Sequence, residues 1–270
     1  PLPLIESFQP DLIIPMSVEW AEQPWATGMK NYPIFSPVGE AMQIELSRSF
    51  SAKLCEKYNV SVPKFFYANS RKKAIEIIHD NPRPYVLKNP ICSPFSPVHT
   101  IVCETVDDTL EWIPRLDDSE GIFLQEFYGT AEAGHFVFVS NGEITSLVTN
   151  QEYKRSFTGN MGPVAGAPLG GIAQVDPNDQ YGLAEQLILP LKPWFKIVNY
   201  SGPLQVTAIK NKGKWHAIEY NIRLGITTAA LMLRMLKSPI DNLTDTIQKK
   251  IPTVKWKKDH DFGCTLTLAG

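Results

Sequence analysis

Three residues in the last third of the chain have the types and spacing of a site for a cation and a phosphate. Glu219 and Asn221 lie two residues apart on a predicted strand, so both side chains point to one face, and Arg223 follows on the same side. Two oxygen ligands beside a guanidinium suit a magnesium-bound polyphosphate, because the oxygens hold the cation and the guanidinium binds the transferred group. A cross-strand ion pair between Glu219 and Arg223 is the alternative that this spacing leaves open.

A lysine at the end of an apolar strand is the second candidate. Lys88 closes the predicted strand Tyr85 to Lys88. A charged side chain is costly there unless it emerges at a sheet edge and faces an anion. Lys88 is therefore a candidate anion ligand, with a solvated strand end as the alternative.

The end of the strand predicted for residues 121–127 has the chemistry of nucleoside recognition. Backbone groups of Gln125, Glu126 and Phe127 can hydrogen-bond an adenine edge. The carboxylate of Glu132, on the turn beyond, can accept hydrogen bonds from ribose hydroxyls. An exposed loop acid is the alternative for Glu132.

A glycine-rich segment forms the fourth candidate. Residues 151–171 place Lys154 and Arg155 before five glycines, a composition that suits backbone donors around an anion. A flexible surface loop is an equal alternative. The five histidines are scattered along the chain and receive no catalytic role.

Local signals predict the elements that position these residues. Ser47 begins a helix whose apolar residues recur every fourth position and which ends near Asn59. Ser70 is a predicted N-cap, and the prolines of residues 81–84 end that helix before the strand at residues 85–88. A further strand at residues 100–104 and a helix at 107–116 complete a predicted α+β module of two strands and two helices over residues 60–118.

The second half of the chain predicts an antiparallel sheet. It begins with residues 121–127, and a hairpin follows in which Asn141-Gly142 joins the strands 135–139 and 143–148. Strands at 203–209 and 215–220 flank a second turn, and a helix around Met232 follows. In contrast, residues 10–15 and 32–35 resemble parallel strands at the end of an open α/β unit.

Composition narrows the class of protein. The chain has 270 residues, of which 43% are apolar, and a formal net charge of −2, so bulk charge predicts neither a nucleic-acid nor a membrane partner. The four cysteines form no metal-binding or disulfide pattern, and no apolar run is long enough to span a membrane, so we expect a cytoplasmic protein. Because it opens on Pro1 within a strand-like unit, we expect the chain to be part of a longer protein.

In this order the segments resemble the ATP-grasp superfamily, and within it the phosphoribosylamine–glycine ligases of purine synthesis. The resemblance covers nearly the whole chain. It rests on five runs, which are SPVGEAMQIELSRSF at 36–50, YVLK at 85–88, LQEF at 124–127 with Glu132, QEYKR at 151–155 and IEYNIRLG at 218–225. The run FGCTLTLAG at 262–270 is similar to the start of the family's C-terminal domain.

The resemblance implies an α+β ATP-grasp fold, a small α+β lid and a central antiparallel sheet with helices, after the end of an open α/β domain. The implied divisions are residues 1–45 for that N-terminal domain, 46–59 for a linking helix, 60–118 for the lid, 119–245 for the central sheet and 246–270 for the start of a C-terminal domain.

The resemblance also implies a function, that of an ATP-dependent carboxylate–amine ligase that uses Mg²⁺ and proceeds through an acyl phosphate. It implies that Glu219 and Asn221 hold the metal, that Arg223 orients the acyl phosphate and that Lys154 neutralises the charge that develops in the reaction. The implied ATP contacts are Arg48, Lys88, Gln125, Glu126, Phe127 and Glu132. The implied substrate loop comprises Arg155, Gly162, Pro163 and Gly166.

Departures from the family pattern fall in the substrate-facing segments. The stretch after Lys88 holds three prolines between Pro90 and Pro97 and no glycine, which predicts a stiff phosphate flap. Val164 and Ala165 replace a polar pair, and residues 226–228 replace an Asp-Pro-Glu turn, so we expect a less polar substrate wall. Glycine with phosphoribosylamine, another carboxylate and amine, or nucleotide binding without catalysis all remain open, as does the oligomeric state.

Overall fold

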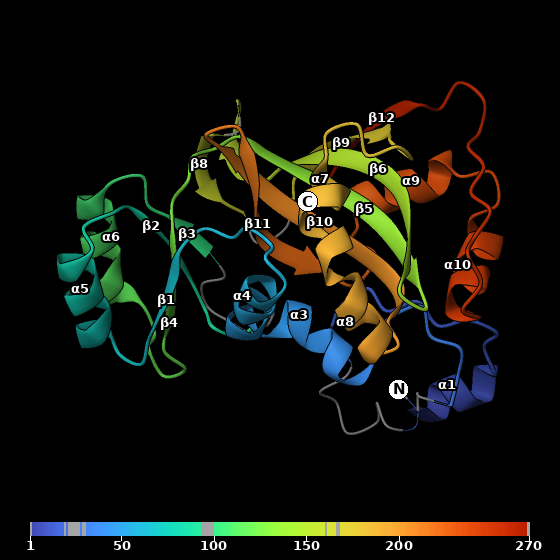
Figure 1. Cartoon of the computed structure of the whole chain (residues 1–270), viewed down its shortest axis with the longest axis horizontal. Helices are drawn as coiled ribbons and strands as arrows, with labels where there is room; N and C mark the ends of the chain where they lie inside the picture. The colour runs from blue at the N-terminus through green and yellow to red at the C-terminus, as the bar shows by residue number, and fades with distance from the viewer. Residues whose placement is uncertain are drawn as a thin grey trace.

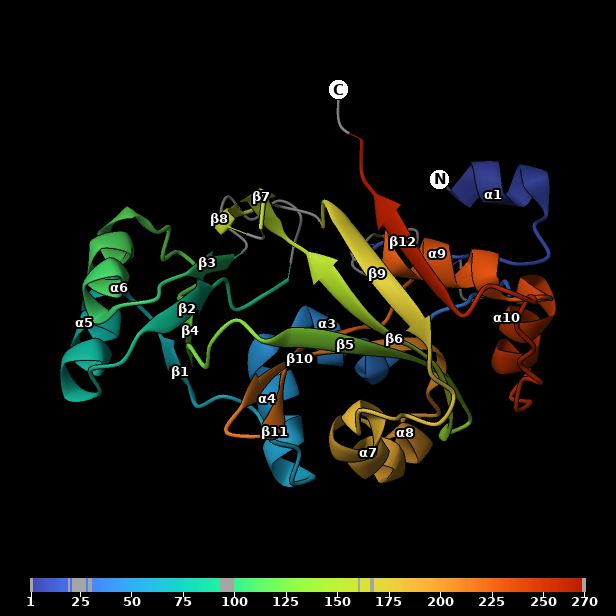
Figure 2. The same cartoon turned by 90° about the horizontal axis from the view of Figure 1, so that it is seen from above.

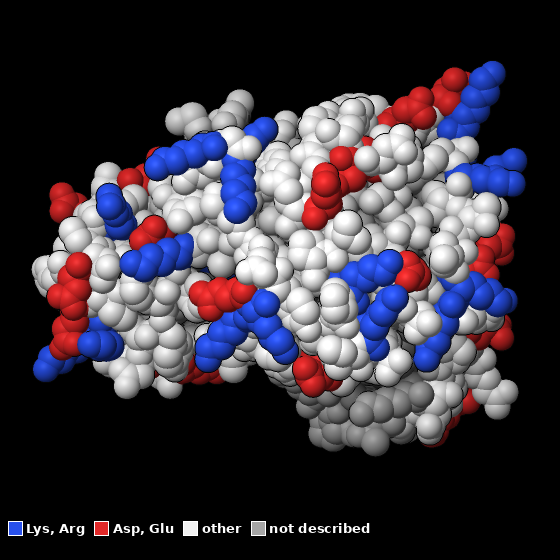
Figure 3. Space-filling model, viewed as in Figure 1, with Lys and Arg blue, Asp and Glu red and all other residues white. Residues whose placement is uncertain are grey.

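The computed structural model describes residues 2–18, 20, 28, 31–92, 100–159, 161–165 and 168–268. Two antiparallel sheets organise it, one of four strands and one of six. The small sheet and its helices form a lobe beside the larger body (Figure 1). Charges of both signs are interspersed on the face shown in Figure 3, in keeping with the net charge of −2.

The small sheet has the strand order β1-β4-β2-β3. Its strands are β1 (Phe65–Ala68), β2 (Tyr85–Lys88), β3 (Thr100–Val102) and β4 (Ile122–Glu126). The elements that cover it are α5 (Arg71–Asp80), α6 (Val106–Trp112) and the 3₁₀ turn Ile113–Arg115. Ser70 caps α5 as predicted, since its hydroxyl accepts the N–H of Lys73.

The boundary predicted at residue 118 is wrong for one strand. β4 was expected in the central sheet, but it pairs with β1 and β2 inside the small sheet. β1 was not predicted. It lies within residues 60–118 and pairs with β4, so this segment holds three strands where two were expected. Sheet membership depends on pairing between distant segments, which local apolar patterns do not encode.

The large sheet has the strand order β11-β10-β5-β6-β9-β12. Its strands are β5 (Glu132–Ser140), β6 (Glu143–Tyr153), β9 (Gly170–Val175), β10 (Ser201–Asn211), β11 (Lys214–Asn221) and β12 (Phe262–Leu266). The predicted hairpin is confirmed, with Asn141 at φ 51° and Gly142 at φ 79°, as a tight two-residue turn requires.

Both faces of the large sheet are buried. Val137 and Val139 face one apolar cluster, and their neighbours Phe136 and Phe138 face the other, as strand alternation requires. The helices on the first face are α3 (Gln43–Leu46), α4 (Arg48–Lys57), α7 (Leu183–Leu187) and α8 (Lys192–Ile197). The helices on the second face are α9 (Thr228–Met235) and α10 (Pro239–Ile247) (Figure 2).

The N-terminal segment forms less sheet than predicted. The two expected strands meet in a single parallel bridge between Ile13 and Ile34, next to α1 (Leu2–Phe8) and the 3₁₀ turn Gly39–Met42. Pro10 and Pro15 bound the first segment, and Pro33 lies within the second. These residues have no backbone N–H to donate, which limits the ladder.

Two further expectations are corrected. The segment predicted as a loop at 151–171 is largely strand, because β6 extends to Tyr153 and β7 (Arg155–Phe157) pairs with β8 (Met161–Val164). Residues 246–270 do not begin apart from the central sheet, since β12 pairs with β9 at its edge. All four cysteines are unpaired. Among the helices of the described residues, none has the length and apolarity needed to cross a membrane.

Candidate functional site

The register of the large sheet brings the predicted polar residues to one face. Glu219 and Asn221 on β11 stand opposite Thr207 and Gln205 on β10, so each shares its partner's face. Thr207 in turn stands opposite Gly134 on β5. Alternation along the strands then places Glu132 on β5 and Glu152 on β6 on this same face.

A cavity of about 150 Å³ lies between this face and the small sheet. The small sheet contributes Val86, Lys88, Thr100, Val102 and Gln125 to its wall. The large sheet and the adjoining β7–β8 hairpin contribute Glu132, Glu152, Lys154, Arg155, Val164, Ile209, Ile218 and Glu219. The structure therefore brings Lys88 and the predicted carboxylates to opposite walls of one cavity.

Lys88 is buried, and the two acceptors that its ammonium reaches among the described residues are neutral. β2 lies inside the small sheet, and 7% of the residue is exposed, so the predicted alternative of a solvated strand end is wrong. Its Nζ donates to Gln125 Oε1 at 2.8 Å and to the carbonyl of Ile218 at 3.3 Å. Burial, with the nearby Arg48 guanidinium, lowers the pKa of Lys88 to about 7. An anion bound next to Lys88 Nζ would favour the charged form of the lysine and pair with it.

Lys154 lies among three carboxylates. Its Nζ is 3.0 Å from Glu132 Oε1, 3.1 Å from Glu219 Oε1 and 3.8 Å from Glu152 Oε2. Burial alone would lower the pKa of Lys154, but the three carboxylates outweigh it and raise that pKa above its ordinary value. The same ammonium holds the pKa of Glu219 well below its usual range, so both groups stay charged at neutral pH.

Arg223 pairs with a residue that the sequence did not single out. Its Nε donates to Glu45 Oε1 at 3.0 Å, and Glu45 Oε2 accepts the N–H of Ile222 at 2.7 Å. The alternative of a Glu219–Arg223 ion pair is wrong, because Glu219 pairs with Lys154 instead. Burial raises the pKa of Glu45, and Arg223 opposes this shift. Glu45 lies within the run at 36–50 that carries the family resemblance, but it received no role there.

A smaller cavity of about 40 Å³ adjoins the first. Glu219, Asn221, Glu45, Arg48 and Gln125 are among its lining residues. Arg48 is fixed there by its Nε, which donates to the carbonyl of Asn89 at 2.8 Å. Asn221 Oδ1 accepts a hydrogen bond from Arg223 at 3.3 Å. An amide oxygen and a carboxylate that stays ionised are ligands that fit a divalent cation.

The predicted adenine contacts need revision in part. The N–H groups of Glu126 and Phe127 already donate to the carbonyls of Lys64 and Pro84, at 2.8 and 2.9 Å. These two donors therefore do not face the cavity as predicted, although residues 125–130 form part of its wall. Glu132, predicted as a ribose ligand or an exposed acid, is the first residue of β5 and pairs with Lys154.

The predicted anion cradle at residues 151–171 is corrected as well. Arg155 donates to the carbonyl of Gly162 at 3.2 Å and pairs with Glu104 at 3.1 Å, and the carbonyl of Pro163 accepts a hydrogen bond from Ser156. The backbone N–H groups of Ala165 and Leu169 are also engaged, since they donate to the carbonyls of Lys154 and Tyr153 at 2.7 and 2.8 Å. Gly166 lies outside the described residues.

A buried polar chain supports the site from behind. Asn150 accepts a hydrogen bond from Gln205 and donates one to Thr228, at 3.2 Å each. Glu152 Oε1 accepts from the hydroxyls of Thr227 and Thr228, at 3.1 and 3.2 Å. The expected apolar wall rested on Ile226, and the two threonines that follow it direct their hydroxyls to Glu152. Glu152 was part of a quoted motif but received no role, because its partners lie 75 and 76 residues away.

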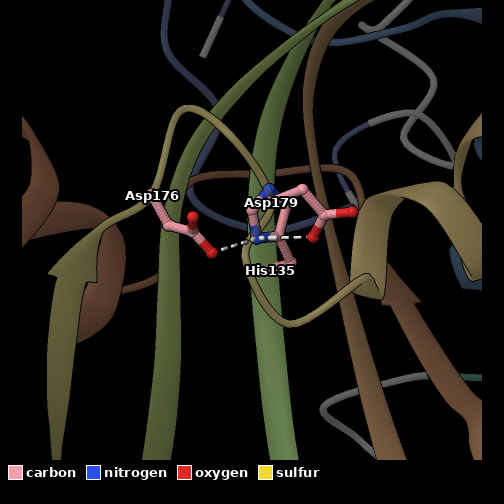
Figure 4. Close-up of side chains that lie close together, drawn as sticks. All are labelled: His135, Asp176 and Asp179. Atoms are coloured by element: carbon pink, nitrogen blue, oxygen red, sulfur yellow. Dashed lines mark ion pairs between the residues drawn. The ribbon is translucent and has the colours of Figure 1, made fainter.

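One polar cluster lies away from the cavity. Figure 4 shows His135 between Asp176 and Asp179, with its Nδ1 3.9 and 3.8 Å from their oxygens. Backbone N–H groups and the Thr149 hydroxyl bind these carboxylates, so the cluster fastens β5 to the start of α7. Burial lowers the pKa of His135 despite the two acids.

The two sheets, the intervening cavity and its charged walls define the class of protein: the chain has the ATP-grasp fold. It aligns with the crystal structure of a phosphoribosylamine–glycine ligase from Thermotoga maritima with a TM-score of 0.77 and 20% identity, over 95% of this chain and 66% of that one. It also aligns with the biotin carboxylase domain of Hydrogenobacter thermophilus 2-oxoglutarate carboxylase, solved with MgADP, ADP and bicarbonate, with a TM-score of 0.71 and 11% identity, over 97% of this chain and 59% of that one.

In sequence the chain is similar to the phosphoribosylamine–glycine ligases. The enzyme from Streptococcus pyogenes serotype M3 is 26% identical over 238 residues, which cover 83% of this chain. The match spans 56% of that enzyme, so the chain corresponds to about half the length of the curated relative. No protein-family model matches the chain.

Proposed function

We propose that the protein is an ATP-dependent carboxylate–amine ligase related in activity to the phosphoribosylamine–glycine ligases of purine synthesis. The observation that carries this proposal is the cavity in which Lys88 faces Glu219, Glu132 and Lys154. Among the residues that the structure describes, the buried Lys88 ammonium donates to an amide oxygen and a carbonyl, which suits the binding of phosphate. The opposite wall supplies charges of both signs for the transferred group.

Each residue has a distinct part in the proposed reaction. Lys88 binds nucleotide phosphate, and Arg48 adds positive charge next to it. Arg223, fixed through its Nε by Glu45, orients the acyl phosphate. Lys154, held between Glu132 and Glu219, offsets charge that develops on the transferred phosphoryl group. Catalysis of this kind is positioning and electrostatic stabilisation, because the protein forms no covalent bond to the substrate.

A magnesium ion fits the same site. Glu219 and Asn221 would hold it, since both line the smaller cavity and offer oxygen ligands. When bound, the ion would neutralise charge on the nucleotide phosphates. The small-molecule substrates and a cytoplasmic location belong to the same proposal, and the four unpaired cysteines support the latter.

The test is phosphate release from ATP and Mg²⁺ by the purified protein. Glycine with phosphoribosylamine is the first substrate pair, followed by a panel of other amino acids and amines. We expect release that depends on both a carboxylate and an amine. A protein that binds ATP with no release for any pair would be a nucleotide-binding module, and the ligase proposal would then be wrong.

A further inference from the structure

The hydrogen bonds of Lys88 match an uncharged amine. Among the described residues its Nζ has two acceptors, Gln125 Oε1 at 2.8 Å and the carbonyl of Ile218 at 3.3 Å. Both acceptors are uncharged, and a neutral amine has two N–H groups and one lone pair. The two hydrogen bonds therefore use both N–H groups of the neutral form, and the lone pair stays available as a nucleophile.

The position of Lys88 favours the same neutral form and gives it space to react. Only 7% of the residue is exposed, and burial is the main reason why the pKa of Lys88 falls to about 7. Lys88 also lines the cavity of about 150 Å³, which has room for several molecules of the size of water. A desolvated amine thus faces a space that admits a small electrophile.

The charges around Lys88 favour a negative group at Nζ. The Arg48 guanidinium has the largest electrostatic effect there, followed in decreasing order by Glu219, Lys154 and Glu132. Each cation outweighs the acid that comes after it in this order. Together the four groups therefore oppose positive charge at Nζ and stabilise negative charge.

We propose that Lys88 Nζ is a site of carbamate formation with carbon dioxide, and that Arg48 stabilises the product. The nitrogen lone pair attacks the carbon of CO₂, so one C–N bond forms and one C–O π bond breaks onto oxygen, while the nitrogen releases one proton to solvent. The product is an N-carbamate anion that keeps one N–H to donate to Gln125. The step needs no oxidant, reductant or nucleotide, so it goes beyond the proposed ligase function.

Chemical trapping measures the carbamate directly. The wild-type protein is equilibrated with ¹³C-labelled CO₂ at pH 8 and treated with triethyloxonium ion, which converts a carbamate into a stable ethyl ester. Digestion and mass spectrometry then locate the labelled carbon. We expect at least about tenfold more label on Lys88 than on Lys64, an exposed lysine beside Asn81, because only a neutral amine reacts.

The pH dependence of the label provides a second readout in the same protein. At pH 6 and an equal concentration of dissolved CO₂, the label on Lys88 should fall at least about ninefold, because the neutral fraction drops from roughly 0.9 to roughly 0.1. An absence of label on Lys88 at pH 8 would overturn the inference. Equal labelling of Lys88 and Lys64 would overturn it as well.

Variants of Arg48 test the role of the surrounding charge. Arg48→Gln removes the guanidinium charge, so the label on Lys88 should fall severalfold. Arg48→Lys keeps a positive charge and should keep most of the label. Arg115→Gln is the matched control, since Arg115 lies on the exposed surface beside Glu111, and it should leave the label unchanged. A label that Arg48→Gln leaves unchanged would contradict the assignment of the stabilising charge to Arg48.

ADP distinguishes this inference from the proposed function. If Lys88 also binds nucleotide phosphate, saturating ADP should remove the label, and dissolved CO₂ should weaken ADP binding at pH 8. Label that persists with ADP bound would support the carbamate and contradict the proposed phosphate contact of Lys88. Phosphate release in the ligase assay without any label on Lys88 would leave the ligase proposal standing and overturn only the carbamate.

Discussion

Nucleotide binding should draw a proton onto Lys88. In the ligand-free protein burial lowers the pKa of this lysine to about 7, so it is largely neutral above that pH. A phosphate beside Nζ favours the charged form and raises the pKa towards its ordinary value. Binding and protonation are therefore linked.

The magnitude follows from the two pKa values. With a pKa of about 7, roughly 0.1 of the Lys88 side chains carry a proton at pH 8 and roughly 0.9 at pH 6. If the phosphate keeps the lysine fully charged, binding takes up about 0.9 proton at pH 8 and about 0.1 at pH 6. Because the pKa rises on binding, affinity is greatest below about pH 7 and falls by up to about tenfold per unit above it.

Calorimetry in buffers of different ionisation enthalpy measures this uptake. ADP is titrated at pH 6, 7 and 8 into the wild type and into Lys88→Met, and the difference between them removes the proton that the phosphate itself exchanges. The matched control is Lys64→Met, whose ammonium lies at an exposed position beside Asn81. Equal uptake by wild type and Lys88→Met across this range would refute the reasoning about Lys88.

Three further predictions follow from the same geometry. Lys88→Met should raise the free energy of unfolding, measured by urea denaturation, by up to about 5 kcal/mol at pH 6. This gain should shrink as the pH rises from about 7 to 10.5, because over that range the unfolded wild type binds more protons than the folded one. Glu219→Gln should abolish Mg²⁺-dependent phosphate release and also lower the melting temperature, because the ion pair with Lys154 that lowers the Glu219 pKa is lost, whereas retained release would exclude Glu219 as a metal ligand. Gly134→Ala should lower the free energy of unfolding by about 1 to 3 kcal/mol, since the new methyl group meets Asn150. Urea denaturation measures this loss, and an unchanged midpoint would show that Asn150 moves freely.

Local chemistry explains what could be predicted from the sequence. Ser70 caps its helix and Asn141-Gly142 turns its hairpin because the signal for each lies within a few residues. Lys88 was found because a charge at the end of an apolar strand needs a partner, and Glu219 because its spacing places it on one strand face with Asn221 and Arg223. The hypothesis that both belong to one site came from the family resemblance, and the structure places both in the wall of one cavity.

Long-range pairing explains what could not be predicted. The sheet to which β4 belongs depends on β1 and β2, and the partner of Arg223 is Glu45, which precedes it by 178 residues. The hydrogen bonds from Thr227 and Thr228 to Glu152 form only where the start of α9 meets β6. No local pattern contains these contacts.

A crystal structure of the protein with Mg²⁺ and a non-hydrolysable ATP analogue tests the central claim most directly. We expect phosphate oxygens within hydrogen-bonding distance of Lys88 Nζ and the metal on the oxygens of Glu219 and Asn221. A nucleotide bound elsewhere, with Lys88 still bonded to Gln125 and Ile218, would contradict it.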